Sequence, residues 1–226
     1  METKMIEYAR PDGKKAPGYL ELPAAGKTAP AVVVIQEYWG LNPQIKGVAD
    51  RLAKAGYRAL VPDLFRGKTA KNRDEASHLM KGLDWSDAAQ QDVRGAVQHL
   101  KSFSPRKVAV IGFCMGGALT VVASAKVPEV DAGVCFYGIP PQAAADPSTI
   151  RIPMQFHFAT RDDWCNPQAI ETLEKSLERG NVSYELFRYQ ADHAFFNEAR
   201  PEVHDESASK LAWERTLEFL GKHLRA

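Results

Sequence analysis

The sequence predicts an α/β fold with a mostly parallel central sheet of about seven or eight strands, flanked by helices and without a separate cap domain. The chain has 226 residues, enough for one large domain of this kind. Short apolar runs alternate along it with stretches of helical periodicity. No linker rich in glycine, serine or proline divides the sequence, so we expect residues 1–226 to form a single domain.

The first predicted element is an antiparallel hairpin at one edge of the sheet. Residues 6–8 and 18–22 resemble strands, and Pro11, Asp12 and Gly13 between them favour a turn.

Six further apolar runs predict the other strands. Residues 31–36 have the sequence AVVVIQ, which is typical of a strand that is buried on both faces. The remaining runs lie at 57–61, 107–111, 132–136, 153–158 and 184–189.

Helical patterns occupy the gaps between these runs. Ser86 fits the N-cap of a helix whose apolar face carries Val93, Val97 and Leu100. We expect residues 64–85 to form a loop or short helix over the functional site described below. The last helix has an apolar stripe that predicts core packing, formed by Trp213, Leu217, Leu220 and Leu224.

Composition excludes several classes of protein. With 29 Lys and Arg against 28 Asp and Glu, the net charge is +1, which favours neither nucleic acid nor an anionic membrane as a partner. No apolar run is long enough for a membrane span, and the first residues lack the apolar region of a secretory signal. The three cysteines do not suggest a disulfide scaffold, so we expect a cytoplasmic protein.

Cys114 lies between glycines, where an apolar run ends and a helical pattern begins. The segment GFCMG at 112–116 predicts a sharp turn from a strand into a helix. The motif G-x-S-x-G exposes a nucleophilic serine at such a turn. We therefore predict that Cys114 is a nucleophile at a helix N-terminus.

Two later strands end in groups that can activate such a nucleophile. Asp162 and Asp163 follow one strand, and His193 follows the next. The carboxyl ends of parallel strands meet at one edge of a sheet, and the order nucleophile, acid, histidine is that of the α/β-hydrolase fold. Counting forward along the strand favours Asp162 as the acid, whereas counting back from Pro167 favours Asp163; we prefer Asp162.

Glu37 directly follows the AVVVIQ strand. Its loop is where the second oxyanion donor of an α/β-hydrolase originates, so the backbone amides of Tyr38 and Met115 form the predicted oxyanion hole. A carboxylate at Glu37 could hold or remove the thiol proton of Cys114.

Each of these residues also has a purely structural interpretation. Cys114 could be a buried small hydrophobe, the two aspartates could cap a helix, and His193 or Glu37 could be solvated surface groups. Agreement in residue type, order and strand context favours catalysis. The remaining histidines show no metal-ligand spacing, so no metal site is predicted.

With these residues in view, the chain resembles the dienelactone hydrolase (carboxymethylenebutenolidase) family over nearly its full length. The matching segments are QEYWG at 36–40, VPDLF at 61–65, GFCMGG at 112–117, FYG at 136–138, RD at 161–162 and DHAF at 192–195. The resemblance implies a triad of Cys114, Asp162 and His193, an auxiliary Glu37, and cofactor-free hydrolysis of an enol-lactone.

The substrate site departs from the family pattern. Members that act on dienelactone use arginines to bind the substrate carboxylate, and one such position is Asn197 here. Arg200 lies close to Asn197 in the sequence, and Arg73 lies in the region of another such arginine. Either of them, or neither, binds the carboxylate of the substrate. The residues predicted to bind the substrate are Trp39, Phe113, Tyr137, Phe195 and Asn197, with Trp85 and Trp164 as further aromatic candidates.

We therefore predict a cysteine hydrolase that cleaves a small enol-lactone or activated ester through a thioester acyl-enzyme. One alternative is a general carboxylesterase or thioesterase with a different substrate. Another is a non-catalytic protein that binds a ligand or senses redox state through Cys114. The expected partner is a small molecule, without nucleic acid or membrane, and the expected assembly is a monomer or small homo-oligomer.

Overall fold

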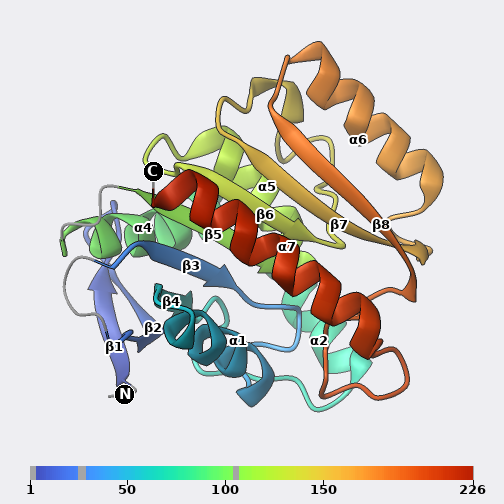
Figure 1. Ribbon diagram of the computed structural model, residues 1–226. Helices are drawn as coiled ribbons and strands as arrows, with labels where there is room; N and C mark the ends of the chain where they lie inside the picture. Colours follow the sequence, from blue (N-terminus) through green and yellow to red (C-terminus); the bar gives the residue numbers. More distant parts are fainter. Residues whose placement is uncertain (1–3, 25–28, 104–106, 226) are drawn as a thin grey trace.

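The computed structural model describes residues 4–24, 29–103 and 107–225. Eight strands form one sheet in the order β1-β2-β4-β3-β5-β6-β7-β8 (Figure 1). The strands are β1 (Lys4–Ala9), β2 (Lys15–Glu21), β3 (Ala31–Ile35), β4 (Arg58–Pro62), β5 (Val108–Phe113), β6 (Ala132–Phe136), β7 (Met154–Arg161) and β8 (Tyr184–Asp192). Strands β3 to β8 run parallel, whereas β1 and β2 form the antiparallel hairpin predicted at one edge. The predicted fold class is confirmed.

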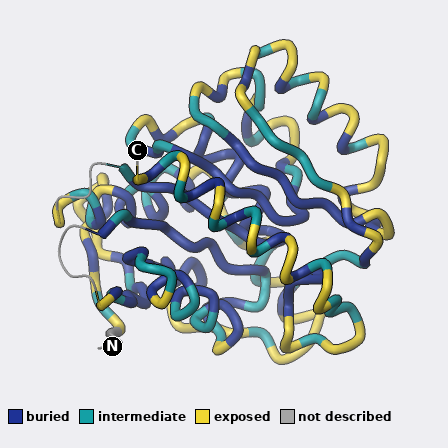
Figure 2. The backbone as a smooth tube through the Cα atoms, in the orientation of Figure 1, coloured by how far each residue is buried: buried dark blue, intermediate teal, exposed yellow. Residues whose placement is uncertain are grey.

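Helices cover both faces of the sheet. They are α1 (Pro43–Lys54), α2 (Arg73–Lys81), α3 (Trp85–Asp87), the π-helix η2 (Ala88–Val93), α4 (Arg94–Lys101), α5 (Met115–Lys126), the short 3-10 helix η3 (Pro147–Thr149), α6 (Pro167–Arg179) and α7 (Glu206–Leu224). Helices α1 and α7 pack on one face, and η2, α4, α5 and α6 pack on the other (Figure 1). Buried backbone follows the strands, and exposed backbone follows the outer sides of the helices (Figure 2).

The strand predictions differ from the structure mainly at the ends. The run at 57–61 forms β4, which is shifted by one residue. The last two strands extend further than their apolar runs, to Arg161 and Asp192. Because side chains at the ends of these strands point out of the core, polar residues continue them.

The N-cap predicted at Ser86 is wrong. Asp84 is the cap, because its carboxylate accepts hydrogen bonds from the backbone amides of Ser86 (2.9 Å) and Asp87 (3.0 Å). The helix then widens into η2, where buried Asp92 accepts hydrogen bonds from Arg10 (3.1 Å) and Arg66 (2.7 Å). The apolar face predicted after it is fully buried at Val93, Val97 and Leu100.

The predicted stripe of α7 is only part of its core face. Leu220 and Leu224 are buried, whereas Trp213 and Leu217 are partly buried against the same cluster. The fully covered positions also include Ala212, Thr216 and Phe219. The segment predicted as a loop or short helix contains α2, in which only Ala76 is buried.

Candidate active site

Four strands deliver polar side chains to one edge of the sheet. Glu37 follows β3, Cys114 follows β5, Asp162 follows β7 and His193 follows β8. These strands are parallel, so their carboxyl ends lie together, as in other open α/β sheets that bind ligands there. The predicted assembly of these four residues is therefore present.

The turn at Cys114 is sharp and strained. Cys114 has φ 56° and ψ −117°, a backbone conformation that residues with a side chain rarely adopt. Two glycines make the turn possible. A Cβ at Gly112 would lie 2.0 Å from the carbonyl oxygen of Gly116, and a Cβ at Gly116 would lie 2.3 Å from that of Ile35. The close packing fixes the sulfur at the start of α5.

His193 bridges the thiol and a carboxylate. Its Nε2 lies 3.3 Å from Cys114 Sγ, and its Nδ1 lies 2.6 Å from Asp162 Oδ2. The other oxygen of Asp162 accepts hydrogen bonds from the amides of Trp164 and Cys165, each at 2.9 Å. These contacts hold the carboxylate in place and fix the orientation of the imidazole.

The structure brings Asp162, and not Asp163, to the imidazole. Asp162 is 7% exposed, whereas Asp163 is exposed to solvent. The backbone carbonyl of Asp163 instead accepts a hydrogen bond from Asn166, the N-cap residue of α6. Asp163 thus lies in the loop that leads into α6.

Glu37 is a buried carboxylate held by two neutral donors. Tyr137 OH donates to Glu37 Oε1 at 3.1 Å, and Asn197 Nδ2 donates to Glu37 Oε2 at 2.8 Å. Burial raises the pKa of Glu37, although both hydrogen bonds and His193 oppose the shift. Glu37 therefore binds a proton more readily than an exposed glutamate does.

The pKa of the Cys114 thiol is also raised. Burial is the largest cause, and the negative charge of Glu37 is the next. A hydrogen bond from the backbone amide of Met115 opposes both. A helix N-terminus ordinarily lowers the pKa of a thiol, but burial and Glu37 outweigh that effect here. The site without substrate therefore favours the neutral thiol.

A cavity of about 280 Å³ lies over the thiol. Its lining includes Glu37, Tyr38, Cys114, His193 and Arg200. The Met115 amide points at the sulfur, and Tyr38 lies on the cavity wall. The assignment of their amides to an oxyanion hole stays a prediction.

The five residues predicted to bind the substrate are absent from the lining of this cavity. Phe113 and Phe195 are fully buried in the aromatic core, and Trp39 packs edge-on against Tyr38 beneath the guanidinium of Arg200. Tyr137 and Asn197 lie one layer behind the thiol, where they hold Glu37. These residues therefore support the site and do not form the surface of the cavity.

Two lining residues come from segments that motifs do not mark. Met80 reaches the cavity from α2, and Trp164 reaches it from the loop beside Asp162, whereas Ala194 belongs to the DHAF motif. Trp164 packs against the imidazole with ring centroids 5.5 Å apart. Its aromatic type was a signal in the sequence, whereas nothing in the sequence marked Met80.

A second hollow has both arginines and aspartates in its lining. Arg73, Arg161 and Arg200 line it together with Asp162, Asp163 and Asp192, and it shares Tyr38, Trp164, His193 and Arg200 with the cavity over the thiol, here called the catalytic cavity. Arg161 is paired with Asp192 at 2.9 Å, and Arg200 with Glu202 at 2.9 Å. Both arginines that the sequence left open as carboxylate ligands therefore lie near the site.

Two features are absent from the residues that the structure describes. Among them, no group of three or more His, Cys, Asp or Glu side chains is arranged to hold a metal ion. No helix within the same ranges is long and apolar enough to cross a membrane.

The fold, with its sharp strand-to-helix turn at Cys114, is that of an α/β-hydrolase. The profile of the dienelactone hydrolase family matches residues 16–224, so the chain belongs to that family. "Protein usf" of Aquifex pyrophilus is 35% identical over 98% of this chain and 99% of its own length. "Carboxymethylenebutenolidase 1" of Cupriavidus pinatubonensis is 30% identical over 95% of each chain.

Solved structures show the same fold. The metagenomic "dienelactone hydrolase-like promiscuous phosphotriesterase P91" aligns with a TM-score of 0.81 over 99% of each chain, at 21% identity. The Pyrococcus furiosus esterase Pf2001 aligns with a TM-score of 0.72 over 99% of this chain and 93% of its own, at 20% identity. The protein is thus a hydrolase that acts on ester or lactone bonds of small molecules.

Burial of Glu37 predicts a pH-dependent stability difference. Because folding raises the pKa of Glu37, the contribution of Glu37 to the free energy of unfolding falls as the pH rises above the ordinary glutamate value of about 4.3. Glu37→Gln removes this titration. The free energy of unfolding of Glu37→Gln, relative to that of the parent, should therefore increase from about pH 4 upward. The increase should be about 1.4 kcal/mol for each pH unit by which folding raises the pKa of Glu37.

Denaturant unfolding between pH 4 and 9 measures this difference, with the exposed Glu214→Gln as the matched control. A difference that stays constant or shrinks with rising pH would contradict the assignment of a raised pKa.

Proposed function

We propose that the protein is a cysteine-dependent hydrolase that forms a thioester acyl-enzyme on Cys114. The observation that carries the proposal is the position of His193, which lies within reach of both the thiol sulfur and the buried carboxylate of Asp162. A nucleophile, a base and a group that orients the base are the parts that acyl transfer requires.

Acylation begins from the neutral thiol. His193 Nε2 accepts the thiol proton as the sulfur attacks the ester carbonyl carbon, and Asp162 stabilises the imidazolium that forms. The carbonyl oxygen becomes an oxyanion facing the amides of Tyr38 and Met115. When the C–O bond breaks, the leaving oxygen takes the proton from His193, and the acyl group remains on the sulfur.

Deacylation uses the same base. His193 removes a proton from water, the hydroxide attacks the thioester carbonyl, and the C–S bond breaks. The sulfur recovers the proton, which restores the starting thiol and releases the carboxylic acid. No cofactor enters either step.

Glu37 tunes the resting thiol in this scheme. Its charge disfavours the thiolate before substrate binds, which limits oxidation of the sulfur. A carboxylate with a raised pKa is also a second acceptor for the thiol proton once the substrate is in place. Tyr137 and Asn197 would then act as positioning residues.

An enol-lactone suits this chemistry because an enolate is a weak base and leaves readily. A relative named carboxymethylenebutenolidase supports this substrate class. The second candidate is a general carboxylesterase or thioesterase, which the change from an arginine to Asn197 at the family's carboxylate position favours. Arg200 lines the catalytic cavity and Arg73 only the adjoining hollow, so a substrate carboxylate would meet Arg200 first.

The nucleophile is tested by replacing the sulfur. Cys114→Ala should reduce kcat/KM for an enol ester at least 10³-fold, as loss of a triad member does in related chemistry. Cys114→Ser should also lose most activity, because the site around it favours a neutral group and an alcohol is harder to ionise. Circular dichroism and thermal unfolding confirm that the fold survives, and Cys165→Ala is the matched control. Full activity of Cys114→Ala would overturn the proposal.

The carboxylate contact is tested by Arg200→Gln. Loss of a charge-assisted hydrogen bond worth about 1.5–3 kcal/mol should raise KM for a carboxylate-bearing lactone roughly 10- to 100-fold, with little change for a neutral ester. Arg73→Gln should have the smaller effect. Equal effects of Arg200→Gln on acidic and neutral substrates would show that this residue does not recognise the acid.

A further inference from the structure

The catalytic cavity continues into a groove that the proposed reaction does not use. Met80 and Trp164 line the catalytic cavity and also a neighbouring cavity of about 360 Å³. The other walls of that neighbour are Trp85, Ile139, Pro140, Pro141 and Ala169. The two spaces therefore meet at the Met80 and Trp164 side chains.

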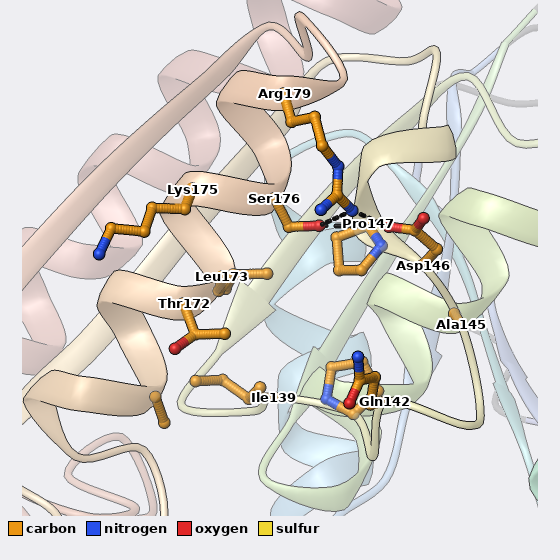
Figure 3. A pocket seen from close by; sticks show the side chains of 12 residues that line it. Ile139, Gln142, Ala145, Asp146, Pro147, Thr172, Leu173, Lys175, Ser176 and Arg179 are labelled. Atoms are coloured by element: carbon orange, nitrogen blue, oxygen red, sulfur yellow. Dashed lines mark hydrogen bonds and ion pairs between the residues drawn. The ribbon is translucent and has the colours of Figure 1, made fainter.

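The groove leads on to a larger hollow beside α6. Ile139, Pro140 and Ala169 belong both to the neighbouring cavity and to this hollow, whose volume is about 490 Å³. Figure 3 shows it between α6 and the segment that follows β6, with Ile139 at one end and Arg179 at the other. Together the three spaces form a path from the thiol to the outer side of α6.

Polar residues line the catalytic cavity beside the thiol, and the path becomes apolar beyond Met80 and Trp164. Between Trp164 and Leu173, the path is lined by aromatic, aliphatic and proline side chains. The charged groups further along are already paired: Lys175 with Glu171 at 2.6 Å, and Arg179 with Asp146 at 3.1 Å. In Figure 3, Arg179 points to Asp146 and Lys175 points away from it. The path thus offers contacts to an uncharged chain.

The position of His193 decides which half of an ester lies in the groove. His193 lines the catalytic cavity and the adjoining hollow, but it is absent from the groove walls, whereas Trp164 lines all three spaces. The leaving oxygen must receive its proton from His193, so the leaving group lies toward that hollow. The acyl group then extends the other way, past Met80, which lines the catalytic cavity and the groove but not the hollow.

We propose that this groove is an acyl-binding subsite, so that the enzyme accepts esters of extended, uncharged apolar acids. The inference rests on the proposed function, since it assumes attack by Cys114. It goes beyond that function because a small enol-lactone would occupy the catalytic cavity alone.

Two substrate series test the direction of the groove. For p-nitrophenyl esters from acetate to decanoate, kcat/KM should rise about fourfold for each methylene added to the acyl chain until the groove is filled. For alkyl acetates of the same lengths, kcat/KM should stay nearly flat. A flat acyl series, or a rise in the alkyl series alone, would overturn the proposal.

A paired substitution on α6 tests its position. Half-buried Ala169 lines two of the three spaces, and its exposed neighbour Gln168 lines none of them. In Ala169→Trp, the ratio of kcat/KM for long-chain esters to kcat/KM for the acetate ester should fall at least tenfold, while acetate hydrolysis stays unchanged. Gln168→Trp should change neither quantity. An unchanged long-chain advantage in Ala169→Trp would contradict the assignment.

These outcomes are separate from failure of the proposed function. If Cys114→Ala still hydrolyses the acetate ester, Cys114 is not the nucleophile, whatever the dependence of the rate on chain length. The two series on the parent enzyme remain decisive if Ala169→Trp does not fold.

Discussion

The contact on which the site depends is the close approach of α5 to the ends of β3 and β5. The carbonyl oxygens of Ile35 and Gly116 lie where any side chain at positions 116 and 112 would stand. This packing forces Cys114 to a positive φ and aims its sulfur at His193. Two other residues beside the site, Tyr137 (φ 38°) and Ala194 (φ 67°), share this rare conformation. Among the described residues, three of the five non-glycine residues with positive φ therefore lie at or beside the site, and the other two are Arg66 and Asn181.

Burial then sets the chemistry of the aimed groups. Glu37 and Cys114 are both shielded from water, so each favours its neutral form. The donors to Glu37 are a phenol and an amide instead of a cation, and they satisfy the carboxylate without cancelling its charge. Where Glu37 is charged, its charge adds to burial in disfavouring the thiolate. A neutral thiol beside His193 fits the proposed mechanism, in which the thiolate forms only as it attacks and His193 takes the proton.

The sequence was sufficient to predict the sheet and the four polar residues at its edge, because apolar runs locate strands and parallel strands end together. It could not choose firmly between Asp162 and Asp163, since a loop of uncertain register separates them from α6. It also could not predict all the walls of the cavity. Met80 reaches the site through the placement of α2, which depends on tertiary packing and leaves no local pattern.

The most direct measurement of the central claim is mass spectrometry of the enzyme quenched with acid during turnover of an activated ester. His193→Asn, which retains a polar side chain but lacks the base for both steps, should carry much less of the adduct. The account predicts an added mass equal to one acyl group, located on the peptide that contains Cys114. An acyl group on another residue, or turnover of the parent enzyme with no covalent adduct in either protein, would contradict it.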